Sequence, residues 1–330
     1  MACTALSRRQ IVRWVATFAP AAAVVSFMPQ GPALADSAVE LRTASRLSPL
    51  TRKDYDPPTN LSTVLDIYRR MTAPVRVDGK GPFPFVVDTG ANQSVISQEL
   101  AVQLGLTTGS IETLNGVAGV QDTATTRTTL GVGRRDENDV ILSILPQAAI
   151  GGVGMLGLDH LEGRRLTLDF RAESLLIEGK GASRRDPDAI VVRAHRRDGQ
   201  LTLIDVDLAG IPLIAILDSG AQNTIGNEAL RQLALTRRPQ TLWSRTPIIS
   251  ATGQSIDADF ADLPALRIGG LRLPNWPVAF ADLHTFRMWN LTRQPAILLG
   301  VDILSRFESV CLDFARDEVR FRLPQRNVTA

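Results

Sequence analysis

Residues 85–91 read FVVDTGA and residues 215–221 read AILDSGA, so an apolar run leads twice into Asp-(Thr/Ser)-Gly-Ala. The two aspartates, Asp88 and Asp218, are 130 residues apart, about the length of one compact domain. Each apolar run is typical of a buried strand that ends at a tight turn. The sequence therefore predicts an internally duplicated chain in which each half supplies one carboxylate to a shared site.

The segments after the two turns also repeat. Ser97 is expected to cap a short helix that ends at Gly105, and Asn227 is expected to cap its counterpart. Further along, residues 155–161 (MLGLDHL) are echoed by residues 298–304 (LLGVDIL). Because strand, turn, helix and glycine-containing strand recur in the same order, we expect two halves of similar fold.

These motifs resemble the retropepsin-like aspartic proteases of bacteria, with two such units fused in one chain, and the likeness covers roughly residues 72–323. The resemblance implies a mostly β, two-lobed acid-protease fold with short helices and a cleft between the lobes. It places the first lobe at residues 72–178, a linker at 179–189 and the second lobe at 190–330. Residues 36–71 would form a separate N-terminal segment.

The same resemblance assigns roles to residues in both halves. Asp88 and Asp218 match the catalytic aspartates. The residues that would shape the site are Thr89, Gly90, Ser219 and Gly220. The candidate flap tips are Val117 and Ala118 in the first lobe, and Ala251 and Thr252 in the second.

The glycines and aspartates of the two repeated segments are expected to have structural roles. Gly157 and Gly300 are expected to lie where two backbones approach closely, on strands that brace the two turns. Asp159 and Asp302 repeat as faithfully as the catalytic candidates, but each precedes a short apolar stretch. We therefore expect these two aspartates to cap helices and leave them out of the site.

The proposed chemistry explains the residue types. Hydrolysis without a metal or a nucleophilic side chain needs one group that activates water and one that polarises the carbonyl, and two carboxyls sharing a proton supply both, as in the known aspartic protease dyads. Glycine after the Thr or Ser has no Cβ, so it allows the φ angle expected of the turn. It also lets backbone amides come close to the carboxylates. Thr89 and Ser219 would link the two turns through their hydroxyls, although such residues also bond to local backbone in ordinary turns.

The N-terminus has the features of an export signal. Residues 7–12 (SRRQIV) resemble a twin-arginine sequence, residues 14–28 are apolar, and residues 33–35 (ALA) offer a small-residue cleavage site. We expect residues 1–35 to direct the protein through the twin-arginine route to the periplasm or the exterior. A membrane location is expected only if this signal stays uncleaved, since its apolar stretch is short for a membrane span. Within segment 36–71, residues 61–71 are expected to form a short helix or an edge strand.

The composition and charge of the chain limit which partners and cofactors are expected. The formal net charge of +2 falls to about −1 once the three signal arginines are removed, so charge gives no reason to expect nucleic acid binding. Cys311 would then be the single cysteine, which excludes an internal disulfide, and three histidines are few for a metal cluster. Residues 152–157 satisfy Gly-x-Gly-x-x-Gly, but the apolar segment after them is too short for the helix of a dinucleotide site. We expect no metal and no cofactor.

The sequence thus predicts a monomeric aspartic endopeptidase that acts on a peptide or protein substrate. An alternative is a catalytically inactive peptide-binding protein of the same fold. A homodimer in which each lobe pairs with its twin is a further alternative. A glycosidase that uses the same carboxyls is disfavoured by the aromatic content of only 5%, because sugar sites are rich in stacking rings.

Overall fold

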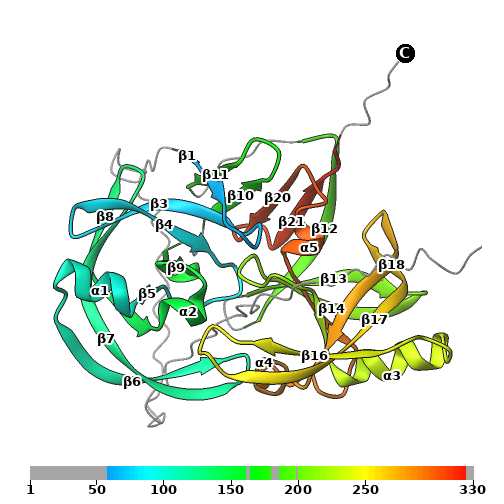
Figure 1. The fold of residues 1–330 in the computed structure, drawn as a ribbon. Coiled ribbons are helices and arrows are strands. Elements are labelled where there is room, and N and C mark those ends of the chain that lie inside the picture. The colour runs from blue at the N-terminus through cyan, green and yellow to red at the C-terminus, as the bar shows by residue number, and fades with distance from the viewer. Residues whose placement is uncertain (1–57, 161–163, 180–185, 198–199, 325–330) are drawn as a thin grey trace, which may run out of the picture.

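A computed structural model describes residues 58–160, 164–179, 186–197 and 200–324 (Figure 1). The predicted export signal, most of segment 36–71 and part of the predicted linker lie outside the described residues. Within the described part, no helix is long and apolar enough to cross a membrane.

The first lobe is built on an eight-stranded sheet with the order β2-β3-β4-β9-β5-β8-β7-β6. Strand β3 also pairs with β7, which curls the sheet back on itself. The bounds are β2 Val64–Leu65, β3 Met71–Val77, β4 Lys80–Val87, β5 Val95–Ser97, β6 Thr108–Gly116, β7 Gly119–Val132, β8 Arg135–Leu145 and β9 Gly154–Leu156.

The second lobe belongs to a thirteen-stranded sheet with the order β1-β11-β10-β20-β21-β12-β13-β14-β19-β15-β18-β17-β16. Its bounds are β1 Thr59–Ser62, β10 Arg165–Asp169, β11 Ser174–Glu178, β12 Ala189–Arg197, β13 Gln200–Leu208, β14 Ile211–Leu217, β15 Ile225–Gly226, β16 Ser244–Ile249, β17 Ser255–Ile268, β18 Leu271–Phe280, β19 Ala296–Leu299, β20 Ser309–Asp313 and β21 Glu318–Arg322. The protein is therefore mostly β and two-lobed, as the sequence predicted.

The register of the strands shows how closely the halves repeat. Thr72 pairs with Val86 between β3 and β4, and Thr202 pairs with Ile216 between β13 and β14. Thr72 and Thr202 are 130 residues apart, as are Val86 and Ile216, and this is also the interval between the two aspartates. In each lobe the strand before the turn then pairs in parallel with a strand from much later in the chain, β9 or β19.

A sheet shared by the two halves joins the lobes. Strand β10 from the first half pairs antiparallel with β20 from the second, in the upper part of Figure 1. Leu166 lies opposite Leu312, and both are almost completely buried. Each such buried aliphatic side chain contributes about 1.5–3 kcal/mol to stability, so this sheet fixes the lobes relative to each other.

The described part of segment 36–71 forms edge strands. Strand β1 pairs with β11 at one edge of the shared sheet, and β2 pairs with β3 at the edge of the first lobe. The edge-strand alternative for residues 61–71 is therefore the correct one, and no helix occurs there.

Short helices come after the two turns, and their predicted caps are confirmed. Helix α1 (Gln98–Leu104) starts after Ser97, whose hydroxyl accepts from the Leu100 backbone, and ends at Gly105 in the left-handed conformation. Helix α3 (Glu228–Arg237) starts after Asn227, whose side chain accepts from the backbone N–H of Leu230. The remaining helices are α2 (Gln147–Ile150), α4 (His284–Met288), α5 (Val301–Leu304) and the 3₁₀ turn η2 (Leu158–His160).

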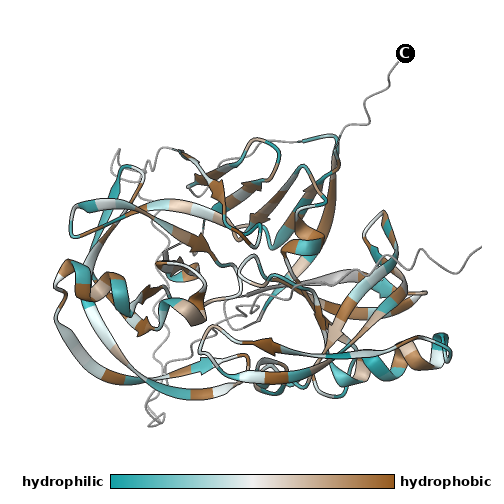
Figure 2. Ribbon diagram, viewed as in Figure 1, coloured by the Kyte–Doolittle hydropathy of each residue, from teal (hydrophilic) through white to brown (hydrophobic). Residues whose placement is uncertain are grey.

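Hydrophobic residues recur along the strands of both lobes, whereas helix α3 alternates polar and apolar residues (Figure 2). One apolar core runs through both lobes and the shared sheet, and it includes Phe85, Leu166, Leu312 and Phe280. The turns that carry the aspartates are thus mounted on a continuous, buried scaffold.

Candidate active site

Asp88 and Asp218 stand directly after strands β4 and β14. The backbone N–H of Asp88 donates to Leu156 of β9 at 3.0 Å, and that of Asp218 donates to Leu299 of β19 at 3.0 Å. Each turn is therefore held from behind by a parallel strand of its own lobe. This placement fixes the backbone from which each carboxyl projects.

The two turns are joined by four reciprocal hydrogen bonds through Thr89 and Ser219. The Ser219 hydroxyl donates to the carbonyl of Val87 at 2.7 Å and accepts from the Thr89 N–H at 3.0 Å. The Thr89 hydroxyl donates to the carbonyl of Leu217 at 3.1 Å and accepts from the Ser219 N–H at 3.1 Å. These hydroxyls bridge the lobes and are not engaged in local turn bonds.

Gly90 and Gly220 lie against the opposite carboxyl groups. A Cβ on Gly90 would fall 2.7 Å from Cγ of Asp218, and one on Gly220 would fall 2.4 Å from Cγ of Asp88. Neither glycine has a positive φ, so the expectation that the turn's φ requires glycine is wrong. Glycine is required because each carboxyl of one lobe packs on the backbone of the other.

The carboxyls are equivalent in their bonding. Oδ1 of Asp88 accepts from the N–H groups of Gly90 at 2.8 Å and Ala91 at 3.1 Å, and Oδ1 of Asp218 accepts from Gly220 and Ala221 at 3.0 and 2.9 Å. Both side chains are fully buried. The Oδ2 atom of each accepts no hydrogen bond from the N–H and hydroxyl groups of the described residues, and the two carboxyls act directly on each other.

Burial makes the two aspartates weaker acids than usual. Desolvation raises the pKa of Asp88 to about 6, although the N–H of Gly90 and the charge of Arg70 hold it down. Desolvation, followed by the charge of Asp88, raises the pKa of Asp218 well above its ordinary value. Two adjacent carboxyls in a buried site cannot both ionise cheaply, so the pair retains one proton over a wide pH range.

Asp159 and Asp302 do not cap helices, which corrects the sequence-based expectation. The carboxylate of Asp159 accepts from the N–H and hydroxyl of Ser94 at 2.9 and 2.8 Å, and Asp302 accepts from the N–H and hydroxyl of Thr224 at 3.1 and 2.7 Å. Helix α5 has Gly300 at its N-cap position and therefore lacks a side-chain cap. The two aspartates instead hold the loop after each aspartate turn in place. Each carboxylate accepts from both the backbone N–H and the hydroxyl of one Ser or Thr in that loop.

Ser94 and Thr224 complete this bracing and were missed from the sequence. The Ser94 hydroxyl accepts from the Gly157 N–H at 2.9 Å, and the Thr224 hydroxyl accepts from the Gly300 N–H at 3.1 Å. The sequence does contain a sign of them, since a Ser or Thr lies six positions after each of Asp88 and Asp218.

The bracing glycines themselves are confirmed as points of close backbone approach. A Cβ on Gly157 would lie 2.7 Å from the carbonyl carbon of Gln93, and one on Gly300 would lie 2.6 Å from that of Asn223. Any larger residue would push the loop behind the turn away from its strand.

The candidate flap residues lie at two hairpin turns. Val117 and Ala118 connect β6 to β7, and Ala251 and Thr252 lie between β16 and β17. Val117 is fully buried within an apolar cluster of the second lobe, whereas Ala251 is fully buried within a cluster of the first. Each tip therefore inserts into the opposite lobe.

The two tips also contact each other and a helix of the second lobe. A Cβ on Gly116 would lie 3.0 Å from Cγ2 of Thr252. The N–H of His284, at the start of α4, donates to the carbonyl of Val117 at 2.7 Å.

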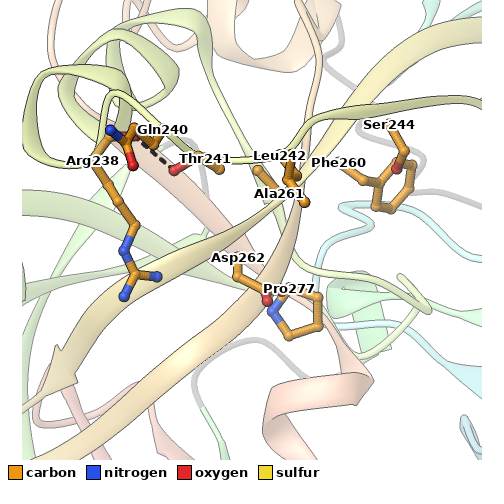
Figure 3. Close-up of a pocket in the computed structure, with 9 residues that line it drawn as sticks. All are labelled: Arg238, Gln240, Thr241, Leu242, Ser244, Phe260, Ala261, Asp262 and Pro277. Carbon is orange, nitrogen blue, oxygen red and sulfur yellow. Dashed lines mark hydrogen bonds between the residues drawn. The ribbon is translucent and has the colours of Figure 1, made fainter. Parts of the chain in front are cut away.

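A surface pocket of about 670 Å³ lies apart from the dyad on the second lobe, between the loop after α3 and strands β17 and β18 (Figure 3). Its lining includes Arg238, Leu242 and Asp262 and neither aspartate of the pair. Within the described residues, no group of three or more histidine, cysteine, aspartate or glutamate side chains is placed to hold a metal ion.

Comparison with known families agrees with this geometry. Residues 73–163 match a family described as gag-polyprotein putative aspartyl protease, and residues 204–303 match a family described as aspartyl protease. A search among curated proteins gave no match. Each match covers one lobe and contains one of the two aspartates. The two halves of the chain thus match aspartyl protease families in succession, which is consistent with a retropepsin-like protease of two domains.

Proposed function

We propose that the protein is an aspartic endopeptidase whose catalytic residues are Asp88 and Asp218. The observation that carries the proposal is the pairing of two buried carboxyls, each with an Oδ2 atom that accepts from no N–H or hydroxyl group of the described residues. An inert scaffold has no need of such a pair, because burying two adjacent acids destabilises the fold. The reciprocal bonds of Thr89 and Ser219 hold the pair in place.

In this proposal the singly protonated pair acts on water and on the scissile carbonyl together. The ionised carboxylate removes a proton from water as its oxygen attacks the carbonyl carbon, and the protonated carboxyl donates to the carbonyl oxygen. The tetrahedral intermediate then collapses, the C–N bond breaks, and the amine leaves with a proton from the pair. Neither a cofactor nor a covalent intermediate is needed.

The test is digestion of a proteome-derived peptide library, read by mass spectrometry. Asp88→Asn and Asp218→Asn should each lower the cleavage rate by about 10²- to 10⁴-fold, since general acid or base catalysis is lost in each. Asp262→Asn, which removes an exposed carboxylate outside the pair, serves as the matched control. Unchanged cleavage by either dyad variant would refute the proposal.

The same experiment separates the enzyme from a peptide-binding protein. Peptides that are retained by the wild type and released uncut would favour the inactive alternative. Because one chain supplies both aspartate turns, we propose a monomer, and sedimentation of the mature protein tests this. A peptide or protein substrate and no nucleic acid partner are part of the same proposal.

We further propose export through the twin-arginine route to the periplasm or the exterior. The support is the sequence of residues 1–35 alone. Replacing Arg8 and Arg9 together by Lys should retain the protein in the cytoplasmic fraction, and N-terminal sequencing of the exported form should begin at Asp36. Export of the double variant at the wild-type level would refute the route.

A further inference from the structure

The tip of the first-lobe hairpin is fastened to a helix of the second lobe. The backbone N–H of His284 donates to the carbonyl of Val117 at 2.7 Å, and Nε2 of His284 lies 3.4 Å from the side-chain oxygen of Asn115. The side chain of Val117 is fully buried in an apolar cluster that also contains Phe286 and Trp289. Helix α4 therefore holds this tip through a backbone hydrogen bond and through buried apolar surface.

The tip of the second-lobe hairpin has no comparable hydrogen bond. Its backbone bonds stay within the hairpin, since Ser250 donates to the carbonyl of Gln254 and Gly253 donates to that of Ser250. Among the described residues, no backbone hydrogen bond joins this tip to the first lobe. The hairpin reaches toward helix α2 (Figure 1), where Ala251 is buried in a cluster that includes Ile150. The two tips are therefore held unequally.

Helices α2 and α4 occupy matching places in the two lobes, but their first N–H groups have different partners. Strand β5 pairs with the strands on either side of α2, as β15 pairs with those on either side of α4. The first residue of α2, Gln147, donates to the carboxylate of Glu99 in its own lobe at 2.9 Å, whereas His284 donates to the opposite hairpin. The connection that carries α4, residues 281–295, is also longer than residues 146–153, which carry α2. The fastening is thus a feature of the second half alone.

These contacts lie beside the buried aspartates. Val117 shares its apolar cluster with Ile216 and Ala221, which flank the second aspartate turn. Both carboxyls of the pair are fully buried, so no peptide can touch them in this arrangement of the chain. A bound peptide therefore requires a more open arrangement.

We propose that helix α4 is a latch that holds the first-lobe hairpin closed, and that release of Val117 from His284 is the step that opens the pair of carboxyls to a peptide. The first tip also packs on the second, because a Cβ on Gly116 would lie 3.0 Å from Cγ2 of Thr252. We therefore expect both tips to loosen once the latch is released. The gating role rests on the proposed function, whereas the latch itself does not.

The test breaks the latch without unfolding helix α4. In His284→Pro the N–H is lost and the proline ring takes the place of the hydrogen, so the carbonyl of Val117 must move away. Proline is well tolerated at the first position of a helix, and the extended backbone of Leu283 (φ −68°, ψ 139°) suits a following proline. Amide hydrogen exchange at both hairpin tips should become about tenfold faster, because a buried carbonyl loses its donor.

The control is the same substitution at the matching position of the first lobe. Gln147→Pro removes the first N–H of α2, whose partner Glu99 lies in its own lobe, and Pro146 before it is similarly extended (φ −60°, ψ 134°). It should leave exchange at both tips unchanged. Equal acceleration by Gln147→Pro, or none by His284→Pro, would overturn the proposal.

Two further measurements separate the latch from other effects. His284→Ala keeps the N–H and removes the ring, so exchange at the tips should stay close to that of the wild type. Acceleration as large as in His284→Pro would show that the backbone bond is not the latch. The amides of β10 and β20 serve as an internal reference, and their exchange should not change. If they became faster by the same factor, His284→Pro would be acting on the whole fold and the latch would be refuted.

The cleavage readout distinguishes this proposal from the proposed function. If the wild type cuts peptides, His284→Pro should raise kcat/KM by up to about tenfold, because a larger fraction of the molecules is open to peptide. Faster exchange at the tips of a protein that cuts no peptide would uphold the latch and defeat the endopeptidase. Cleavage with the same kcat/KM in the wild type and in His284→Pro would defeat the gating role alone.

Discussion

Replacing Asp88 by Asn should make the protein more stable at neutral pH while abolishing its proposed activity. The amide keeps the oxygen that accepts from the N–H groups of Gly90 and Ala91. Its NH₂ group takes the place of Oδ2, which accepts from no N–H or hydroxyl group of the described residues, and can donate to Asp218. The substitution therefore removes a buried charge with little change in shape.

The magnitude can be worked from the raised pKa. In the unfolded chain Asp88 has its ordinary pKa of 3.8, and burial raises the pKa to about 6 in the fold. The folded state thus binds more protons between these values, so stability is complete below pH 3.8 and is lost as pH rises through 6. At 1.36 kcal/mol per unit, the loss for the wild type is about 3 kcal/mol at pH 7.5. Removing Asp88 also removes the charge that raises the pKa of Asp218, which adds to the gain.

Urea unfolding followed by tryptophan fluorescence, at pH 7.5 and pH 4, measures this effect. The gain of Asp88→Asn over the wild type should be at least about 3 kcal/mol at pH 7.5 and should be much smaller at pH 4. Asp262→Asn, at an exposed position, should show no such dependence. A variant that is no more stable than the wild type at pH 7.5, or that gains equally at both pH values, would refute the reasoning.

Three further substitutions test the packing around the pair. Gly220→Ala should lower kcat/KM by about 10²-fold, because the new Cβ would fall 2.4 Å from Cγ of Asp88, whereas Gly270→Ala, with open space around it, should have no effect. Ser219→Ala should lower the free energy of unfolding by about 2–4 kcal/mol in urea titrations, because it leaves one buried N–H and one buried carbonyl of the opposite turn unpaired. A loss under about 0.5 kcal/mol would contradict the bridging role. Val117→Ala should destabilise the inserted hairpin tip by about 1.6 kcal/mol. Amide hydrogen exchange at the tips of both hairpins should therefore become about tenfold faster. Unchanged exchange would show that the buried tip does not hold the hairpins closed.

Much of the site was accessible from the sequence because its parts are local and repeated. An apolar strand, an Asp-(Thr/Ser)-Gly turn and a capped helix are short motifs whose conformations depend on neighbouring residues. Their recurrence 130 residues later indicated two lobes and one carboxyl from each. The caps at Ser97 and Asn227 could be predicted for the same reason, since a cap bonds to a backbone N–H three residues away.

Where the sequence-based interpretation was wrong, the contacts are distant along the chain. Asp159 lies next to an apolar stretch in sequence and looks like a cap, but its carboxylate bonds to Ser94, 65 residues earlier. Of the two reasons expected for the turn glycines, the φ requirement is wrong, whereas the close approach to a carboxyl is confirmed and involves the carboxyl of the other lobe. Neither relation leaves a mark on the local sequence.

The sequence by itself determined the duplication, the pair of aspartates and the turns that carry them, because strand, turn and cap propensities act over a few residues. Only the tertiary structure decided that each hairpin tip is buried in the opposite lobe and that Arg70 donates to backbone carbonyls of both lobes. Burial and electrostatic coupling depend on distances in space, and folding brings together groups as far apart as Arg70 and Gly220, which are 150 residues apart along the chain.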